Sequence, residues 1–175
     1  RSNEEVRDIY YVRKIDGKWS APQTVFDDNW TIPGCPVNGP AIAAQEDFVA
    51  VAWFSSAEND PQVKVAFSID AGATFGTPVR LDNGSPLGRV DVLIMDKERV
   101  LVSWVEKSEK NADIRGRIIT SGGLMGDSHK LLETTPSRES GFPVLARSGE
   151  QTFLSWTEVD SIGTRVKTGE LIVEE

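Results

Sequence analysis

The hydrophobic positions of this chain fall into short runs, and polar segments rich in Gly, Pro, Asn and Asp separate them. Three runs end on a tryptophan: Val-Ala-Val-Ala-Trp at 49–53, Val-Leu-Val-Ser-Trp at 100–104 and Thr-Phe-Leu-Ser-Trp at 152–156. Runs of this length and composition, bounded by turn residues, predict β-strands. The tryptophans lie about fifty residues apart and no segment between them has helical spacing, so the pattern predicts an all-β repeat protein.

A period near fifty that is built from strands and turns is typical of a β-propeller, in which each repeat forms one four-stranded antiparallel blade. The run at 49–54 is apolar on both faces, because Val49, Val51 and Trp53 point one way and Ala50, Ala52 and Phe54 point the other. A strand of that kind lies between neighbouring sheets. We therefore expect the three repeat tryptophans to be core residues and not a platform for a ligand.

The repeats divide the chain into parts of a single, partial propeller domain. Residues 1–34 are expected to supply the third and fourth strands of a closing blade, 35–87 and 88–140 to form complete blades, and 141–175 to form a C-terminal blade without its outer strand. About three blades are too few for a ring, which normally has four to eight. Either an upstream half of the same protein or a second copy, forming a homodimer, would complete it.

Composition excludes several classes of partner. The chain has 175 residues, 39% of them hydrophobic, and a formal net charge of -8. This charge opposes phosphate backbones, so nucleic acid is not an expected partner. No apolar run approaches the roughly 18 residues that span a bilayer, so membrane insertion is not expected, and an export signal would have to lie upstream of Arg1.

The residues that most often bind metals are scarce. Cys35 is the single cysteine and His129 the single histidine, and they fall in different repeats. One cysteine allows no internal disulfide, and one of each gives too few ligands for a transition-metal site. We therefore expect neither a metal nor a cofactor.

The turn between the third and fourth strands of the repeat at 35–87 has the form Ser-x-Asp-x-Gly-x-Thr-aromatic. The Asp carboxylate can accept hydrogen bonds from turn amides and hydroxyls, the Gly permits a positive φ, and the aromatic ring can pack the turn onto the sheet. We interpret the motif as structural; its residues are Ser68, Asp70, Gly72, Thr74 and Phe75.

This motif, with a shortened version at 14–19, resembles the Asp box of the bacterial sialidase-like family with BNR repeats. The resemblance implies a six-bladed propeller, of which this chain is the C-terminal half, in a secreted or periplasmic protein. It also implies that ligands bind at the end of the ring opposite to the Asp boxes, and that the ligand is a carbohydrate.

Because propeller strands alternate in direction, six loops should meet at that opposite end: 27–39, 82–89, 133–141, 54–62, 106–112 and 158–163. The Arg89 guanidinium could bind a carboxylate in bidentate fashion, and Arg138 could approach from the next loop. Period-two alternation puts Asp91 on the same face as Arg89, so we expect a structural ion pair, with a general-acid role for Asp91 as the alternative. The other ligand-binding candidates in this region are Trp30, Cys35, Asn38 and Glu58.

The resemblance also states what catalysis requires. Sialidases use an arginine triad, a tyrosine activated by a glutamate, and an aspartate as acid and base. Here Tyr10 and Tyr11 fall on an outer strand and the Arg-Ile-Pro signature of the first triad arginine is missing. We therefore expect a sialidase-like module that binds a glycan or a partner, has no assignable catalytic residue and is not a complete enzyme. The alternative is the C-terminal half of an exo-acting glycoside hydrolase whose remaining catalytic residues lie upstream.

Overall fold

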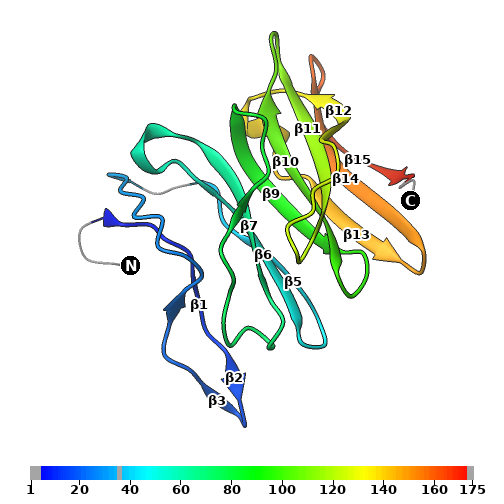
Figure 1. The fold of residues 1–175 in the computed structure, drawn as a ribbon. Coiled ribbons are helices and arrows are strands. Elements are labelled where there is room, and N and C mark those ends of the chain that lie inside the picture. Colours follow the sequence, from blue (N-terminus) through cyan, green and yellow to red (C-terminus); the bar gives the residue numbers. More distant parts are fainter. Residues whose placement is uncertain (1–4, 35–36, 173–175) are drawn as a thin grey trace.

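The computed structural model describes residues 5–34 and 37–172, and its regular structure is almost entirely β (Figure 1). The first sheet contains β5 (Ala41–Gln45), β6 (Phe48–Ser55), β7 (Gln62–Ser68) and β8 (Val79–Arg80). The second contains β9 (Pro86–Ile94), β10 (Arg99–Lys107), β11 (Ala112–Thr120) and β12 (His129–Thr134). The third contains β13 (Val144–Ser148), β14 (Gln151–Asp160) and β15 (Gly163–Leu171). Each strand pairs antiparallel with the next, so the predicted all-β fold of roughly four-stranded sheets is confirmed.

The helical segments that the structure describes are short. They include the 3-10 turns η2 (Ala57–Asn59) and η3 (Arg138–Ser140), each of which lies in a loop between strands. The described ranges contain no helix of the length and apolar character needed to cross a membrane.

The N-terminal segment forms two short strand pairs beside the first sheet. Strand β1 (Tyr10–Tyr11) pairs with β4 (Gln23–Thr24), and between them β2 (Lys14–Ile15) pairs with β3 (Lys18–Trp19). Strands were expected in both regions that form β1 and β4, but the paired parts are shorter than the runs that predicted them. The segment packs on residues of β6 in the first sheet through Ile9, Tyr11 and Val25. Among the described residues, this segment does not pair with the third sheet.

The three sheets succeed one another as a stack, from the centre to the right of Figure 1. One core cluster lies between the first and second sheets and a second cluster lies between the second and third. Strand β10 contributes to both, because Val100, Val102 and Trp104 face the first sheet while Leu101 and Val105 face the third. Trp53 and Trp104 are fully buried, as expected for core residues, whereas Trp156 is partly buried.

Each repeat tryptophan has a cation directly opposite on the neighbouring strand, and this repeated feature was not predicted. The cross-strand pairs are Trp53 with Lys64, Trp104 with Arg115 and Trp156 with Lys167. Each cation lies near a carboxylate, with N···O distances of 2.5 Å for Lys64–Asp28, 4.0 Å for Arg115–Glu106 and 2.8 Å for Lys167–Glu158. The repeat therefore includes a polar cluster beside each tryptophan as well as the strand itself.

Candidate functional site

Four of the six loops expected at one end of the sheets, 27–39, 54–62, 82–89 and 133–141, contribute to a pocket of about 340 Å³. The pocket brings together four of the seven candidate ligand-binding residues, namely Trp30, Asn38, Arg89 and Arg138. The rest of its lining is mainly apolar: Ile32, Val37, Phe54, Leu87, Pro136 and Phe142. We refer to this as the arginine pocket, and its geometry follows from how β9 begins.

A β-bulge at the start of β9 directs Arg89 into this pocket. Val105 is opposite Gly88 and Ser103 is opposite Asp91, so two residues of β9 oppose Trp104 alone. Arg89 has a φ of 55°, in the left-handed region that a residue with a Cβ adopts only at a cost. Such strain persists where surrounding contacts hold the residue in place.

Those contacts come from the Arg89 guanidinium, which is buried against the segment that leads to the third sheet. Nη1 donates to Ser140 Oγ at 2.5 Å, and Nη2 donates to the carbonyl oxygens of Pro136 and Ser137 at 3.0 and 2.9 Å. Burial lowers the pKa of Arg89, and the nearby charge of Arg138 lowers it further. Among the described residues, none of the ion pairs includes Arg89 or Arg138. Among the residues that the structure describes, the positive charge of the pocket thus has no carboxylate at ion-pair distance.

Asn38 fixes the bulge from the other side. Its Oδ1 accepts a hydrogen bond from the Arg89 backbone N–H at 3.0 Å, and its Nδ2 donates to the Leu87 carbonyl at 3.1 Å. Gly88 is required beneath it, because a Cβ at this position would lie 2.5 Å from Cγ of Asn38 and the backbone φ is 84°. Asn38 is thus a positioning residue of the pocket as well as part of its wall.

The expected ion pair between Asp91 and Arg89 is not formed, so that prediction was wrong. The bulge breaks the period-two alternation that would have put both side chains on one face. Asp91 instead accepts hydrogen bonds from the backbone N–H groups of Val92 at 2.9 Å and Leu145 at 2.6 Å. Burial raises the pKa of Asp91, and these two bonds oppose the rise. Asp91 links the second sheet to the third and does not line the arginine pocket.

Aromatic side chains form the apolar wall of the pocket. Trp30 packs edge-to-face on Phe54, with ring centroids 5.7 Å apart and an interplanar angle of 77°. The Trp30 backbone N–H donates to Asp8 Oδ1 at 3.2 Å, which holds this loop against the N-terminal segment. Phe142 remains 46% exposed at the edge of the pocket. A ligand there would meet both aromatic side chains and guanidinium groups.

Two further candidates do not join this group. Glu58 is exposed in η2, where it has a φ of 55°, and it does not line the pocket. Cys35 lies outside the described residues. Among the residues that the structure does describe, no three His, Cys, Asp or Glu side chains come together as a metal site would require.

The turn that contains Asp70 lies at the opposite end of the sheets, and its hydrogen bonds are those expected of a self-satisfied hairpin. Asp70 accepts from Ser68 Oγ at 2.7 Å, from the Thr74 backbone N–H at 2.9 Å and from Thr74 Oγ1 at 2.7 Å. Gly72 has a φ of 76°, and Phe75 packs edge-to-face on Tyr11 with centroids 5.0 Å apart. These bonds hold the pKa of Asp70 far below its usual value. The carboxylate is fully used by the turn.

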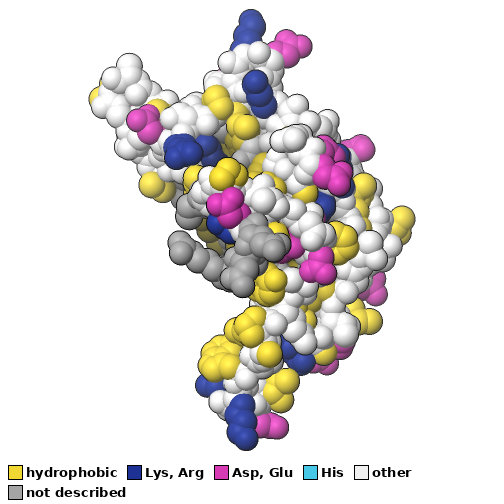
Figure 2. Space-filling view, turned by 90° about the vertical axis from the view of Figure 1, so that its left-hand side faces the viewer, with side chains coloured by type: hydrophobic (Ala, Val, Ile, Leu, Met, Phe, Trp, Pro, Cys, Tyr) yellow, Lys and Arg dark blue, Asp and Glu magenta, His cyan; other side chains and the backbone are white. Residues whose placement is uncertain are grey.

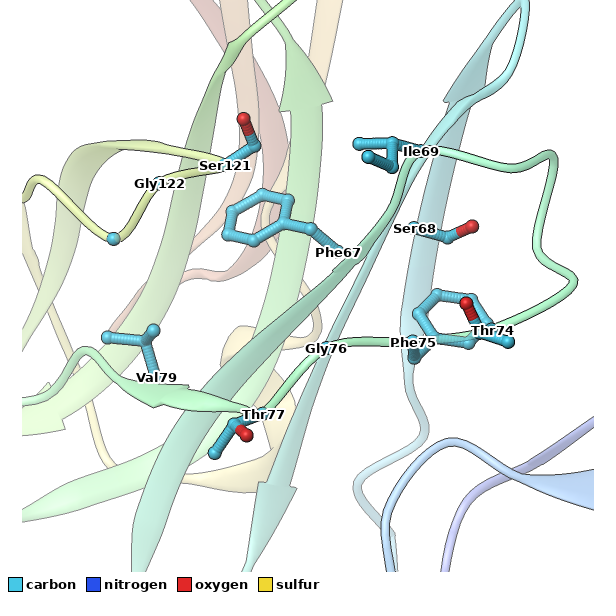
Figure 3. Close-up of a pocket in the computed structure, with 11 residues that line it drawn as sticks. Phe67, Ser68, Ile69, Thr74, Phe75, Gly76, Thr77, Val79, Ser121 and Gly122 are labelled. Carbon is cyan, nitrogen blue, oxygen red and sulfur yellow. The ribbon is translucent and has the colours of Figure 1, made fainter.

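A second pocket, of about 530 Å³, opens beside this turn (Figure 3). It lies between the segment after β7 and the turn at Ser121–Gly123, and the Phe67 ring points toward the latter. Its described lining residues include hydroxyls but no titratable side chain. The arginine pocket, whose lining carries two guanidinium groups, is therefore the better candidate site.

Sequence reasoning did not identify the roles of two buried carboxylates. Glu106 accepts from Trp104 Nε1 at 2.8 Å and from the Asn83 and Ser85 backbone N–H groups at 3.0 and 3.1 Å. Asp28 accepts from Trp53 Nε1 at 2.6 Å as well as from Lys64. Glu106 and Glu158 both follow a repeat tryptophan by two residues, and that spacing could have indicated a structural role.

Comparisons with known proteins identify the fold and no more. No protein-family model matches the sequence, and no curated protein does. Among solved structures, the chain is similar to the catalytic domain of the Coprinopsis cinerea GH62 α-L-arabinofuranosidase, with a TM-score of 0.50 and 11% identity. The match covers 94% of this chain and 64% of that one, so the chain spans less than two thirds of the domain that it matches.

Two weaker matches are the Bombyx mori GH32 β-fructofuranosidase BmSUC1 and a glycosyl hydrolase from Bacteroides ovatus. The first has a TM-score of 0.42 and 14% identity and covers 81% of this chain and 39% of that one. The second has a TM-score of 0.41 and 12% identity and covers 88% and 50%. The chain thus has, over most of its length, the fold of β-propeller glycoside hydrolase domains. This similarity carries no information on the sialidase resemblance or on the number of blades.

Proposed function

We propose that this chain is a carbohydrate-binding module with a propeller-type glycosidase fold, and that its ligand carries an anionic group. The observation that supports this most directly is the arginine pocket, in which Arg89 and Arg138 lie near each other and no carboxylate is among the lining residues that the structure describes. An anion would neutralise this charge. On the family resemblance, we also assign the module to a sialidase-like, secreted or periplasmic protein.

The chemistry of the pocket fits an acidic sugar. A guanidinium offers paired N–H donors to a carboxylate, and such charge-assisted bonds are shorter and stronger than neutral ones. Arg89 already uses three donor contacts to hold the loop, so the exposed Arg138 is the more available partner for a ligand. Phe142 and the pair formed by Trp30 and Phe54 offer apolar surface for the less polar face of a sugar ring.

The residues that line the pocket favour a function in binding without hydrolysis. Glycoside hydrolysis uses two carboxylates roughly 5 to 10 Å apart across the scissile bond, and the described residues that line the arginine pocket include no carboxylate. The tyrosines do not replace them: Tyr11 Oη donates to Gln23 Oε1 at 2.8 Å beside the first sheet, and Tyr10 lies on the same short strand.

A second candidate function is the C-terminal part of an exo-acting, sialidase-type glycoside hydrolase. The coverage of only 64% of the arabinofuranosidase domain favours it, because residues outside this chain could supply the missing carboxylates. In that case the arginine pocket would be a substrate subsite, and this chain alone would still be inactive.

Sugar titrations and an activity assay test the proposed binding function. Titration followed by NMR should show binding of methyl α-D-galacturonide or N-acetylneuraminate, and weaker or no binding of methyl α-D-galactopyranoside, which has the same ring without the carboxylate. Equal affinity for the galacturonide and the galactoside would contradict the anion site. A panel of fluorogenic glycosides should show no turnover by the chain, and turnover would overturn the binding-only function.

A further inference from the structure

The third sheet has an outer face that no other part of the described chain covers. Leu145, Leu154 and Leu171 point into the core shared with the second sheet, so alternation places their neighbours on the opposite face. Val144 and Val166 on that face are 53% and 77% exposed. The face consists of Val144, Ala146, Phe153, Ser155, Thr157, Val159, Thr164, Val166, Thr168 and, at one margin, the single charged residue Glu170.

The same face is buried in each of the other two sheets. Relative to the repeat tryptophan, Ser155 corresponds to Ala52 and Ser103, which are both 0% exposed. In the same alignment, Phe153 corresponds to Ala50 and Leu101. In the first sheet this face packs on the tryptophan-bearing face of the sheet that follows it. The third sheet thus presents a surface that the chain itself buries by stacking the next sheet upon it.

At the other end of the stack, the first sheet leaves exposed a position that the second and third sheets bury. Ile42, Val92 and Leu145 are equivalent, because each is opposite the residue two before a repeat tryptophan. Val92 and Leu145 are 6% and 7% exposed, since each packs on the preceding sheet, whereas Ile42 is 65% exposed. Figure 2 faces this N-terminal side, where hydrophobic side chains lie at the surface.

The N-terminal segment covers this end only in part. It packs on Val49, Val51 and Trp53 of β6 and leaves Ile42 of the neighbouring strand β5 exposed. The open part of the first sheet is therefore its first strand. In the packing that the chain repeats internally, the first strands of neighbouring sheets lie close together. We therefore expect β13 of an incoming sheet to lie near β5.

We propose that a second copy of this chain covers both ends: the outer face of the third sheet of one copy packs on the Ile42 side of the first sheet of the other. This continues the packing that already joins the first sheet to the second and the second to the third. In a two-fold pair both contacts are equivalent and both ends of each copy are covered, so the assembly closes and does not grow into a filament. The proposal is independent of the arginine pocket and of any ligand.

Sedimentation velocity of the full 175-residue chain tests the assembly. We expect a species of twice the 19.2 kDa chain mass. Val166→Asp and Ile42→Asp should each raise the dissociation constant at least about tenfold, because each contact buries Val166 of one copy and Ile42 of the other, and an unpaired charge at either position is costly. Leu124→Asp is the matched control: Leu124 is 77% exposed near the turn between β11 and β12, away from both faces, and its variant should remain a dimer.

Mixing the two interface variants separates a lost contact from a folding defect. A chain with Val166→Asp keeps its Ile42 side, and a chain with Ile42→Asp keeps its outer face, so the mixture retains one intact contact and should associate more strongly than either variant alone. A monomeric wild-type chain, or a ladder of open oligomers, would overturn the proposal. Dissociation by Val166→Asp but not by Ile42→Asp would also overturn it, because two outer faces would then be packing on each other.

Discussion

Arg89 and Ser140 are joined by a 2.5 Å hydrogen bond from the Arg89 guanidinium to the Ser140 hydroxyl, although 51 residues separate them. Ser140 in turn donates to the Thr135 carbonyl, at 2.9 Å, so the bond is part of a small buried network. This network holds the loop that carries Arg138 against the start of β9. The position of the more exposed arginine in the pocket therefore depends on the buried one.

Replacing the two arginines should separate structure from binding. Arg89→Ala removes the donor from three acceptors in a largely buried site, and we expect the free energy of unfolding to fall by about 1–3 kcal/mol. Arg138→Ala should change the free energy of unfolding by less than about 0.5 kcal/mol, because the Arg138 side chain is exposed and substitutions at exposed positions usually have small effects. Urea denaturation measures both, and the galacturonide titration should show weaker binding for both. An equal loss of stability in the two variants would contradict the different roles given to them.

The bulge at Gly88 provides a second test of the pocket. Gly88→Ala would put a Cβ 2.5 Å from the Asn38 side chain and would also strain the backbone at a φ of 84°. We expect a loss of about 1–3 kcal/mol in the free energy of unfolding, since Asn38 must move away from the atoms that it bonds. Gly149→Ala is the control, because Gly149 has a φ of 59° but nothing within 4 Å of its Cβ position. Denaturation curves in which both variants lose the same stability would attribute the effect to backbone strain alone.

Glu106 and Glu158 test the repeated polar cluster. Glu106 is buried and accepts from one indole and two backbone N–H groups, so Glu106→Gln should cost about 1–3 kcal/mol, because a neutral amide has one acceptor oxygen in place of two. Glu158 occupies the equivalent position two residues after Trp156 but lies in a more open site and pairs with Lys167. Glu158→Gln should cost less than about 0.5 kcal/mol. Thermal unfolding of the two variants checks the difference, which a similar shift in Tm would contradict.

The fold could be predicted because its signal is repeated along the chain. The tryptophan runs identify the second strand of each sheet, and the apolar residues on both faces of that strand require sheets on both sides. The shape of the N-terminal segment was less accessible, because the pairs β1–β4 and β2–β3 extend over only two residues each and their limits depend on packing against β6. The number of blades in a complete ring is not encoded in a local pattern at all.

The site could be predicted at the level of loops but not of contacts. Strand alternation identifies which loops share an end, and Trp30, Asn38, Arg89 and Arg138 meet there. The predicted ion pair between Arg89 and Asp91 was wrong because the bulge at Gly88 and Arg89 adds one residue to the strand. Side chains before the bulge therefore point to the face opposite to the one that simple alternation predicts. A glycine within a strand pattern is a known indication of a bulge, so Gly88 was the one available signal.

Asp70 and Asp91 should give opposite dependences of stability on pH. The pKa of Asp70 is lowered by its turn, so its stabilising effect is present above the pKa of the unfolded chain, about 3.9, and is lost as the pH falls below that value. The pKa of Asp91 is raised by burial, so its contribution is greatest below about pH 3.9 and falls as the pH rises through the higher pKa of the folded state. The two groups thus titrate in different windows.

Measurements of Tm between pH 2 and 7 for the wild type, Asp70→Asn and Asp91→Asn test these signs. The difference between wild type and Asp70→Asn should be largest near pH 7 and should shrink below pH 4, because Asp70 then binds a proton in the unfolded chain while its carboxylate stays ionised in the folded one. The difference for Asp91→Asn should shift the other way, in favour of the variant as the pH rises. The remaining carboxylates are common to all three proteins, so their titration cancels in each difference. If the difference for Asp70→Asn does not change with pH, the turn is held by its backbone geometry and not by the charge of its carboxylate.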